Sequence, residues 1–303
     1  MIQRYPRIRI HSEDGTLLVR EGLSISFFMH YTHAEIAQGV LKALEHYRSA
    51  VGPEGLGLYA DDEGGWWTLD AEGWDAVRHQ LHHPHRASVH LVGTSAEQRR
   101  YRFDYDGKRL GAPALAREPG AVSAVAFWLP TEYLEAQGPE QVRALAMTLA
   151  APLPLCSGHA GLAFNGALDR ASVKQELHPW RFRYPGLDIL DLDRHSWNLG
   201  TRVRTVSWLT FLGAPVLEEL GGAAALRSLL SWPDTQVEAM EGGRAVVTLG
   251  AAPEAGDTEA GELLPGYREL AHVLEPWLYQ EPFQPGSGFT EDELRRWERR
   301  FLD

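Results

Sequence analysis

The sequence predicts an α+β fold with mixed or antiparallel sheets and helices packed on them. Extended segments alternate apolar with polar residues or are rich in β-branched and aromatic residues, as at 206–211. Helical segments begin with capping signals, such as Thr32 three residues before Glu35. No internal repeat and no linker rich in Gly, Ser or charge divides the chain. We therefore expect one continuous unit over residues 1–303. If this unit has two lobes, we expect the joint between them at residues 110–120.

The N-terminal half is expected to combine a hairpin, amphipathic helices and further strands. Asp14-Gly15 supplies a turn between two extended runs, the second of which Gly22 would break. Residues 122–129 are almost all apolar, which indicates a strand buried on both faces. The segments expected in this half are a hairpin at 8–29, a helix at 36–47, a strand at 56–59, a helix at 74–81 and strands at 87–92, 100–105 and 122–129.

The C-terminal half is organised around residues 205–230. This stretch combines a strand signal, a break at Gly213 and two short helical segments. Gly221 and Gly222 separate the two helices, because glycine adopts the left-handed conformation that ends a helix. Few polar residues lie here and none forms a catalytic pair, so we interpret the stretch as scaffold. The other segments expected are a helix at 139–149, a strand at 153–165, an irregular stretch at 171–200, a hairpin at 236–249 and helices at 267–278 and 290–301.

The bulk composition argues against several classes of function. A formal net charge of −12 opposes nucleic-acid binding, which needs a clustered Lys/Arg surface. One cysteine, Cys156, cannot form an intramolecular disulfide framework. No apolar run approaches the roughly 20 residues of a membrane span, and the opening MIQRYPRIRI lacks the apolar region of a signal peptide. We therefore expect a cytoplasmic protein that binds neither nucleic acid nor membrane.

The histidines support a metal-binding hypothesis. His79 and His83 are four residues apart, which would place both on one helical face and suit zinc. His85 or His90 could supply a third ligand. Against this, Pro84 breaks a helix at that point, and no carboxylate or Cys pair lies nearby at ligand spacing. The alternative reading is a set of exposed histidines favoured by the dipole at the end of a helix.

A second candidate for chemistry is the run Asp188, Asp191 and Asp193 before His195. Paired carboxylates with a histidine could perform general acid/base catalysis. The alternative is an edge strand kept soluble by its charges. Elsewhere the chain lacks a Gly-rich phosphate loop, a nucleophile elbow and a Cys/His zinc pattern. We therefore expect no catalytic residue and no cofactor.

An acidic cluster, Asp61, Asp62 and Glu63, stands just before two tryptophans, Trp66 and Trp67. The cluster lacks the alternating Asp spacing and the later Glu of a calcium loop. A solvated acidic loop is one reading. Charge beside exposed aromatic rings is also how many protein contact surfaces are built. These five residues are therefore the candidate partner-binding site.

Several short motifs follow one another over residues 120–280. They are CSGHAGLAFN at 156–165, YPGLD at 184–188, WLTFLG at 208–213, LGG at 220–222 with Leu226, GAAPEAGD at 250–257, LPGYR at 264–268 and LEP at 274–276. Together they resemble the bacterial type VI immunity family. The shared positions are mostly Gly, Pro, Trp and Leu, which serve turns, close packing and core. Contacts with a partner are therefore expected on loops outside these motifs.

The resemblance implies a cytoplasmic antitoxin that binds one cognate secreted toxin and neutralises it by direct protein–protein contact. The family has no established catalytic residues to transfer. A toxin met in the cytoplasm is expected to be a nuclease, whose basic cleft an acidic protein would complement. Two alternatives stay open. One is a metal-dependent hydrolase that uses the His79–His90 cluster or Asp188 with His195, and the other is a structural component of a secretion system.

Overall fold

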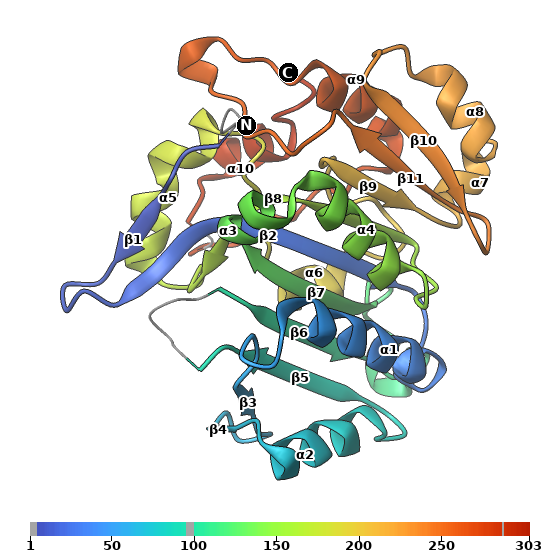
Figure 1. The fold of residues 1–303 in the computed structure, drawn as a ribbon. Coiled ribbons are helices and arrows are strands. Elements are labelled where there is room, and N and C mark those ends of the chain that lie inside the picture. The colour runs from blue at the N-terminus through green and yellow to red at the C-terminus, as the bar shows by residue number, and fades with distance from the viewer. Residues whose placement is uncertain (1–4, 95–99, 287) are drawn as a thin grey trace.

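Eleven strands form one antiparallel sheet in the computed structural model, which describes residues 5–94, 100–286 and 288–303. From edge to edge the order is β10, β11, β9, β8, β2, β7, β6, β5, β3 and β4, and β1 pairs with β2 beside this path (Figure 1). The strands are β1 (Arg9–His11), β2 (Leu17–Met29), β3 (Leu58–Ala60), β4 (Trp66–Thr68), β5 (Ala87–Val92), β6 (Arg102–Gly107), β7 (Ser123–Pro130), β8 (Ser157–Gly166), β9 (Leu209–Leu212), β10 (Thr235–Met240) and β11 (Arg244–Leu249).

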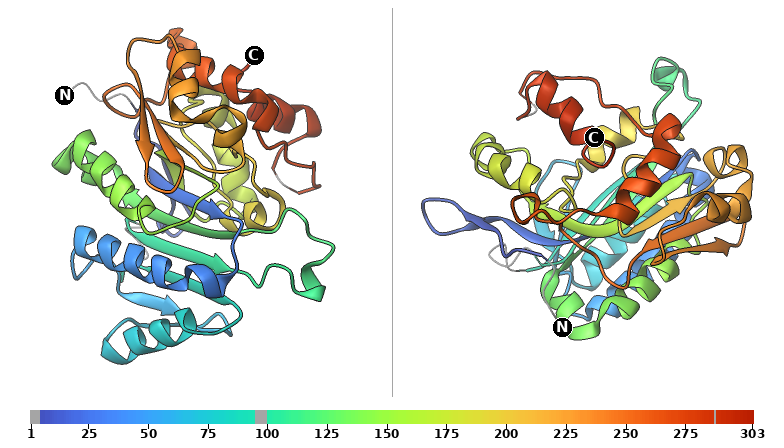
Figure 2. Two further views of the ribbon diagram at one scale, coloured as in Figure 1. Left: turned by 90° about the vertical axis from the view of Figure 1, so that its right-hand side faces the viewer. Right: turned by 90° about the horizontal axis from the view of Figure 1, so that it is seen from above.

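Helices cover both faces of this sheet, so the predicted α+β class is confirmed (Figure 2). The α-helices are α1 (His33–Val51), α2 (Ala71–Leu81), α3 (Thr131–Gln137), α4 (Pro139–Ala150), α5 (Ala171–Arg183), α6 (Leu192–Asn198), α7 (Val216–Glu219), α8 (Gly222–Leu229), α9 (Pro265–Leu274) and α10 (Glu291–Glu298). Short 3-10 helices are η1 (Pro113–Leu115), η2 (Thr258–Ala260) and η3 (Glu275–Trp277). No helix in the part of the chain described here is long and apolar enough to span a bilayer.

Strand β2 lies at the centre of the sheet, and all 13 of its residues are buried. It pairs with β7 on one side and with β8 on the other. Because side chains alternate across a strand, Ile25 and Phe27 enter the largest core while Phe28 joins a separate cluster. The predicted break at Gly22 is wrong, since the strand runs through it. Glycine is needed there, because a Cβ atom would lie 2.4 Å from the Nδ2 atom of Asn165.

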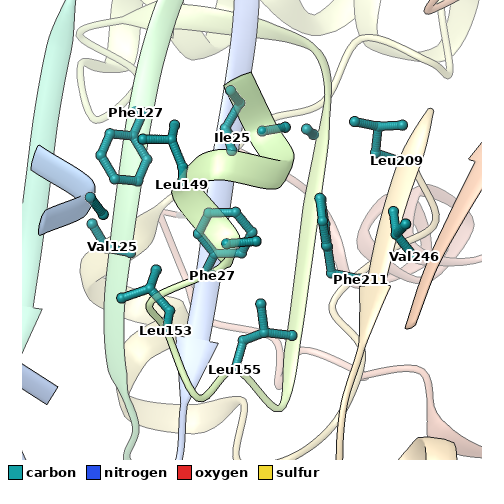
Figure 3. Close-up of a cluster of buried hydrophobic side chains, with 14 of the residues drawn as sticks. Ile25, Phe27, Val125, Phe127, Leu149, Leu153, Leu155, Leu209, Phe211 and Val246 are labelled. Carbon is teal, nitrogen blue, oxygen red and sulfur yellow. The ribbon is translucent and has the colours of Figure 1, made fainter. Parts of the chain in front are cut away.

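Helices α1 to α4 cover one face of the sheet (Figures 1 and 2). The predicted capping box starts α1, with the backbone N–H of Thr32 donating to Glu35 Oε2 at 2.7 Å. Under α4, side chains from β2, β7, β9 and β11 meet in the cluster drawn in Figure 3. Phe27 is central to it and packs edge-on against Phe127 and Phe211, with ring centroids 6.5 and 5.2 Å away.

The opposite face is covered by α5, α6 and α10 (Figure 2). The prediction of an irregular stretch at 171–200 is wrong, because α5 and α6 both lie inside it. The buried positions of α5 are Val173, Leu177 and Arg181, spaced four apart. The third of these buried positions is Arg181. Only two apolar residues therefore show the periodic spacing that identifies a helix in a sequence.

The predicted organising stretch, 205–230, is a short strand followed by two short helices. Strand β9 begins at Leu209, later than expected, because Ser207 is held in a local turn in which its backbone N–H donates to Thr210 Oγ1 at 3.1 Å. Gly221 and Gly222 have φ angles of +83° and +88°, as a break between α7 and α8 requires. Trp208 is buried, as a scaffold role requires.

The predicted joint at 110–120 is a loop that contains η1. Strands β6 and β7, which lie before and after it, pair with each other. The treatment of residues 1–303 as one unit stays a prediction.

A buried cluster of charges ties the C-terminal end of the chain to the sheet. Asp188 lies between Arg204 and Arg300, and the three side chains are only 6–7% exposed. Arg300 donates to Asp188 Oδ1 at 3.3 Å and to Thr205 Oγ1 at 2.9 Å. Arg204 donates to His159 of β8 at 2.9 Å. Burial is the main cause that lowers the pKa of Arg204 to about 9, and the positive charge of Arg300 acts in the same direction.

We predict that Asp188→Asn destabilises the protein by about 3–5 kcal/mol, because it leaves two buried guanidinium groups without their shared negative charge. Asp169→Asn is the matched control, since Asp169 is exposed. Urea denaturation of the parent and both variants measures the difference. Equal midpoints for the parent and Asp188→Asn would contradict this role.

Glu298, at the end of α10, is a partly buried carboxyl group. Its Oε1 atom accepts the backbone N–H of Glu281, and Arg194 forms an ion pair with Glu281. Burial raises the pKa of Glu298 to about 7, and the negative charge of Glu281 acts in the same direction. A carboxyl whose pKa is raised on folding binds more protons in the folded state than in the unfolded state. Its contribution to stability is therefore present below pH 4.5 and is lost as the pH rises towards 7.

We predict that Glu298→Gln raises the melting temperature above pH 7 and leaves it nearly unchanged near pH 4.5. Glutamine keeps a carbonyl oxygen for the N–H of Glu281 and has no proton to lose. Thermal unfolding across this pH range is the measurement. Glu176→Gln, at an exposed position in α5, is the control and should show no such trend. A pH-independent effect of Glu298→Gln would refute the explanation.

Candidate functional site

The five predicted partner-binding residues lie on the β3–β4 hairpin, at one edge of the sheet (Figure 1). Strand β4 is the last in the strand order, and its three residues are exposed. Trp66 and Trp67 are 50% and 57% exposed, which is unusual for rings of this size. Asp62 and Glu63 are exposed in the turn that precedes them. The hairpin therefore places two large apolar rings and two carboxylates together at the surface.

Asp61 differs from its two acidic neighbours, because its carboxylate is used to build the hairpin. Oδ1 accepts the backbone N–H groups of Gly65 at 2.7 Å and Glu63 at 3.0 Å. Oδ2 accepts the indole N–H of Trp67 at 2.6 Å. The bonds from Trp67 and then from Gly65 lower the pKa of Asp61. Asp61 therefore shapes the turn and orients Trp67.

The hairpin and the start of α2 form a continuous acidic segment. Asp70 caps α2 by accepting the backbone N–H of Gly73 at 3.0 Å. No Lys or Arg occurs from residue 61 to residue 77. The six acids of this segment are Asp61, Asp62, Glu63, Asp70, Glu72 and Asp75. Arg78, directly after this segment, forms an ion pair with Asp75 at 2.7 Å. The other five acids still give this edge of the sheet a net negative charge.

The predicted histidine cluster is divided between helix α2 and the segment that follows it. Helix α2 ends at Leu81, so His83 lies beyond it and does not share a helical face with His79. His83 Nδ1 faces the backbone N–H groups of His85 and Arg86, each at 3.3 Å. Within residues 5–94, 100–286 and 288–303, no three His, Cys, Asp or Glu side chains gather closely enough to hold a metal ion.

Asp188 and His195 also occupy separate places, so they do not form the predicted acid/base pair. Asp188 is in the buried arginine cluster, and the prediction of an edge strand through it is wrong. Asp191 Oδ1 caps α6 by accepting the N–H of Arg194 at 3.1 Å. His195 is buried, and its Nε2 atom is 4.0 Å from Glu281 Oε2. Burial lowers the pKa of His195, which favours the neutral imidazole.

A cavity of about 450 Å³ lies on the face of the sheet that α6 covers, and the sequence interpretation missed it. On its wall, Asp104 is 2.6 Å from Arg102 Nε and 2.7 Å from His90 Nδ1. Arg102 also stacks over Trp128, 4.7 Å from the ring. Burial opposes ionisation of Asp104, but Arg102 and His90 outweigh it and lower the pKa. One signal in the sequence could have indicated this wall of the cavity: Arg102 and Asp104 alternate with apolar residues in RFDYDG.

Comparison with known proteins identifies a family and a shared fold for this chain. A family model described as TsiV, type VI immunity for VRR-NUC, matches residues 39–301. No curated protein matches the chain significantly. Among solved structures, the Pseudomonas aeruginosa T6SS protein PA0821 has a TM-score of 0.76 and 20% identity, over 99% of this chain and 88% of that chain. This likeness shows a shared fold. Because the family model spans most of the sequence, the chain belongs to the TsiV family of type VI immunity proteins.

Proposed function

We propose that this immunity protein binds a VRR-NUC nuclease toxin in the cytoplasm and neutralises it by direct contact, without catalysis. Membership of a family described as immunity for VRR-NUC supports the choice of partner. The observation that carries the choice of surface is the β3–β4 hairpin, where Trp66 and Trp67 are half exposed beside Asp62 and Glu63.

Charge supports the same assignment. A nuclease binds a polyanion, and proteins that do so use clustered Lys and Arg. Residues 61–75 carry the opposite sign of charge, and Asp62 and Glu63 are the exposed acids of the hairpin itself. Complementary charge mainly raises the association rate and the specificity of a complex. The acidic edge therefore favours a basic toxin domain over nucleic acid as the ligand.

The hairpin residues have different roles in this proposal. Trp66 and Trp67 are the apolar anchors, since large rings contribute most to binding when a partner removes them from water. Asp62 and Glu63 attract the basic partner before contact. Asp61 acts through Trp67, whose ring it holds by a hydrogen bond.

The direct test is co-expression with the VRR-NUC toxin, followed by size-exclusion chromatography and a growth assay. The proposal expects one complex at micromolar concentration and rescue of growth. Separate elution together with continued toxicity would overturn it.

We predict that Asp62→Lys with Glu63→Lys slows association with the toxin and flattens its dependence on salt, while leaving the melting temperature unchanged. Both residues are exposed, so the change acts through long-range charge. Asp61 is left intact because its carboxylate holds the turn. Stopped-flow or surface-based kinetics at several salt concentrations measure the effect.

The matched control is Glu13→Lys with Glu176→Lys, at two exposed acids outside the hairpin. Each Asp or Glu changed to Lys adds two units of charge, so both double variants move the formal net charge from −12 to −8. The hairpin variant should slow association more than the control. If both variants slow association equally, net charge is the cause and this hairpin is not the binding edge; if neither slows it, the hairpin is not the binding edge either.

A further inference from the structure

The backbone of β4 has unused hydrogen-bonding groups on its outer side. In an antiparallel pair, residues alternate between those that bond to the partner strand and those that face away. Asp61 N–H donates to the Gly65 carbonyl at 2.9 Å, and Leu69 N–H donates to the Gly57 carbonyl at 2.8 Å. Trp67 therefore bonds towards β3, whereas the backbone groups of Trp66 and Thr68 face outward.

Part of this outer side is covered and part is open. The carbonyl oxygen of Thr68 lies against the first turn of α2, since a Cβ atom on Gly73 would be 2.5 Å from it. The open part of this edge consists of the N–H of Thr68 together with the N–H and the carbonyl group of Trp66. They form a short row of a donor, an acceptor and a second donor, which is what an incoming strand needs.

The side chains of β4 do not protect this edge. Proteins guard an exposed edge strand by keeping it very short, as β4 is with three residues, or with Lys, Pro, a bulge or a covering helix. Strand β4 reads Trp-Trp-Thr, and its pairing with β3 is regular. At the other edge, α8 packs against β10, and Glu238 of β10 forms an ion pair with Arg143 at 2.7 Å. The two ends of the strand order therefore differ, and at the β4 end the outward groups of Trp66 and the N–H of Thr68 are available for pairing.

We infer that the toxin docks by strand addition, placing an extended basic segment along β4. This inference rests on the proposed function and specifies the geometry of its contact. Strand addition obtains affinity from main-chain hydrogen bonds and specificity from alternate side chains. Trp66 and Thr68 project to one face of the strand and Trp67 to the other. The added strand would lie between indole rings on both faces, and Lys or Arg within it would meet those rings and the acids of residues 61–75.

Hydrogen exchange on the intact complex is the first test. On binding, the amides of Trp66 and Thr68 should become protected from exchange. The amide of Trp67, already bonded to β3, should change little. Protection of Trp66 and Thr68 that is no greater than that of Trp67 would overturn strand addition.

A backbone substitution is the second test. Thr68→Pro removes the outward N–H, and proline is tolerated on an edge strand where that group faces solvent. Thr68→Val is the control, because it keeps the N–H and the shape of the side chain. We expect Thr68→Pro to weaken toxin binding by about tenfold relative to Thr68→Val, the equivalent of one lost hydrogen bond. Melting curves check that both variants fold.

The outcomes separate this inference from the proposed function. If the parent does not bind the toxin at all, the proposed function fails. If the parent binds tightly, Thr68→Pro binds equally well and the amides of Trp66 and Thr68 stay unprotected, the toxin binds elsewhere or through side chains alone. In that case the immunity role stands and strand addition is wrong. If Thr68→Pro does not fold, the exchange measurement on the parent decides the question.

Discussion

The complete burial of β2 is the constraint on which the rest of this structure depends. A strand with all 13 residues buried needs a neighbour on each side and a layer of helices on each face. Strands β7 and β8 supply the neighbours. Helices α1 to α4 supply one layer and α5, α6 and α10 the other (Figure 2). The sheet then extends outward from this centre until it reaches β10 at one edge and β4 at the other.

The second helical layer is attached by charge as well as by apolar contact. Asp188 is held by Arg204 and Arg300, which come from segments far apart in the sequence. Such a cluster contributes to stability only while it is complete, because each buried ion depends on its partners. This buried cluster therefore serves the attachment of the C-terminal segment.

Local signals in the sequence were sufficient for much of the fold. The capping box at Thr32 and the strand at 87–92 lie where they were predicted, because their signals lie within a few residues. Helix α5 was missed because Arg181 occupies a buried position that an apolar residue usually takes. The role of Asp188 could not be predicted, since its partner Arg300 is 112 residues away. The acidic and aromatic composition of the β3–β4 hairpin is visible in the sequence. Its place at the edge of the sheet is not, because the order of the strands depends on contacts between distant segments.

The position of β4 also has an evolutionary consequence. This strand has three exposed residues and closes one end of the sheet, so side-chain replacements there remove little packing from the core. An immunity protein that recognises its toxin through such an edge can follow mutations in the toxin without losing its fold. Backbone pairing would keep a basal affinity while the side chains diverge. Related immunity proteins would then share the buried centre and differ most at this hairpin, each paired with its own toxin.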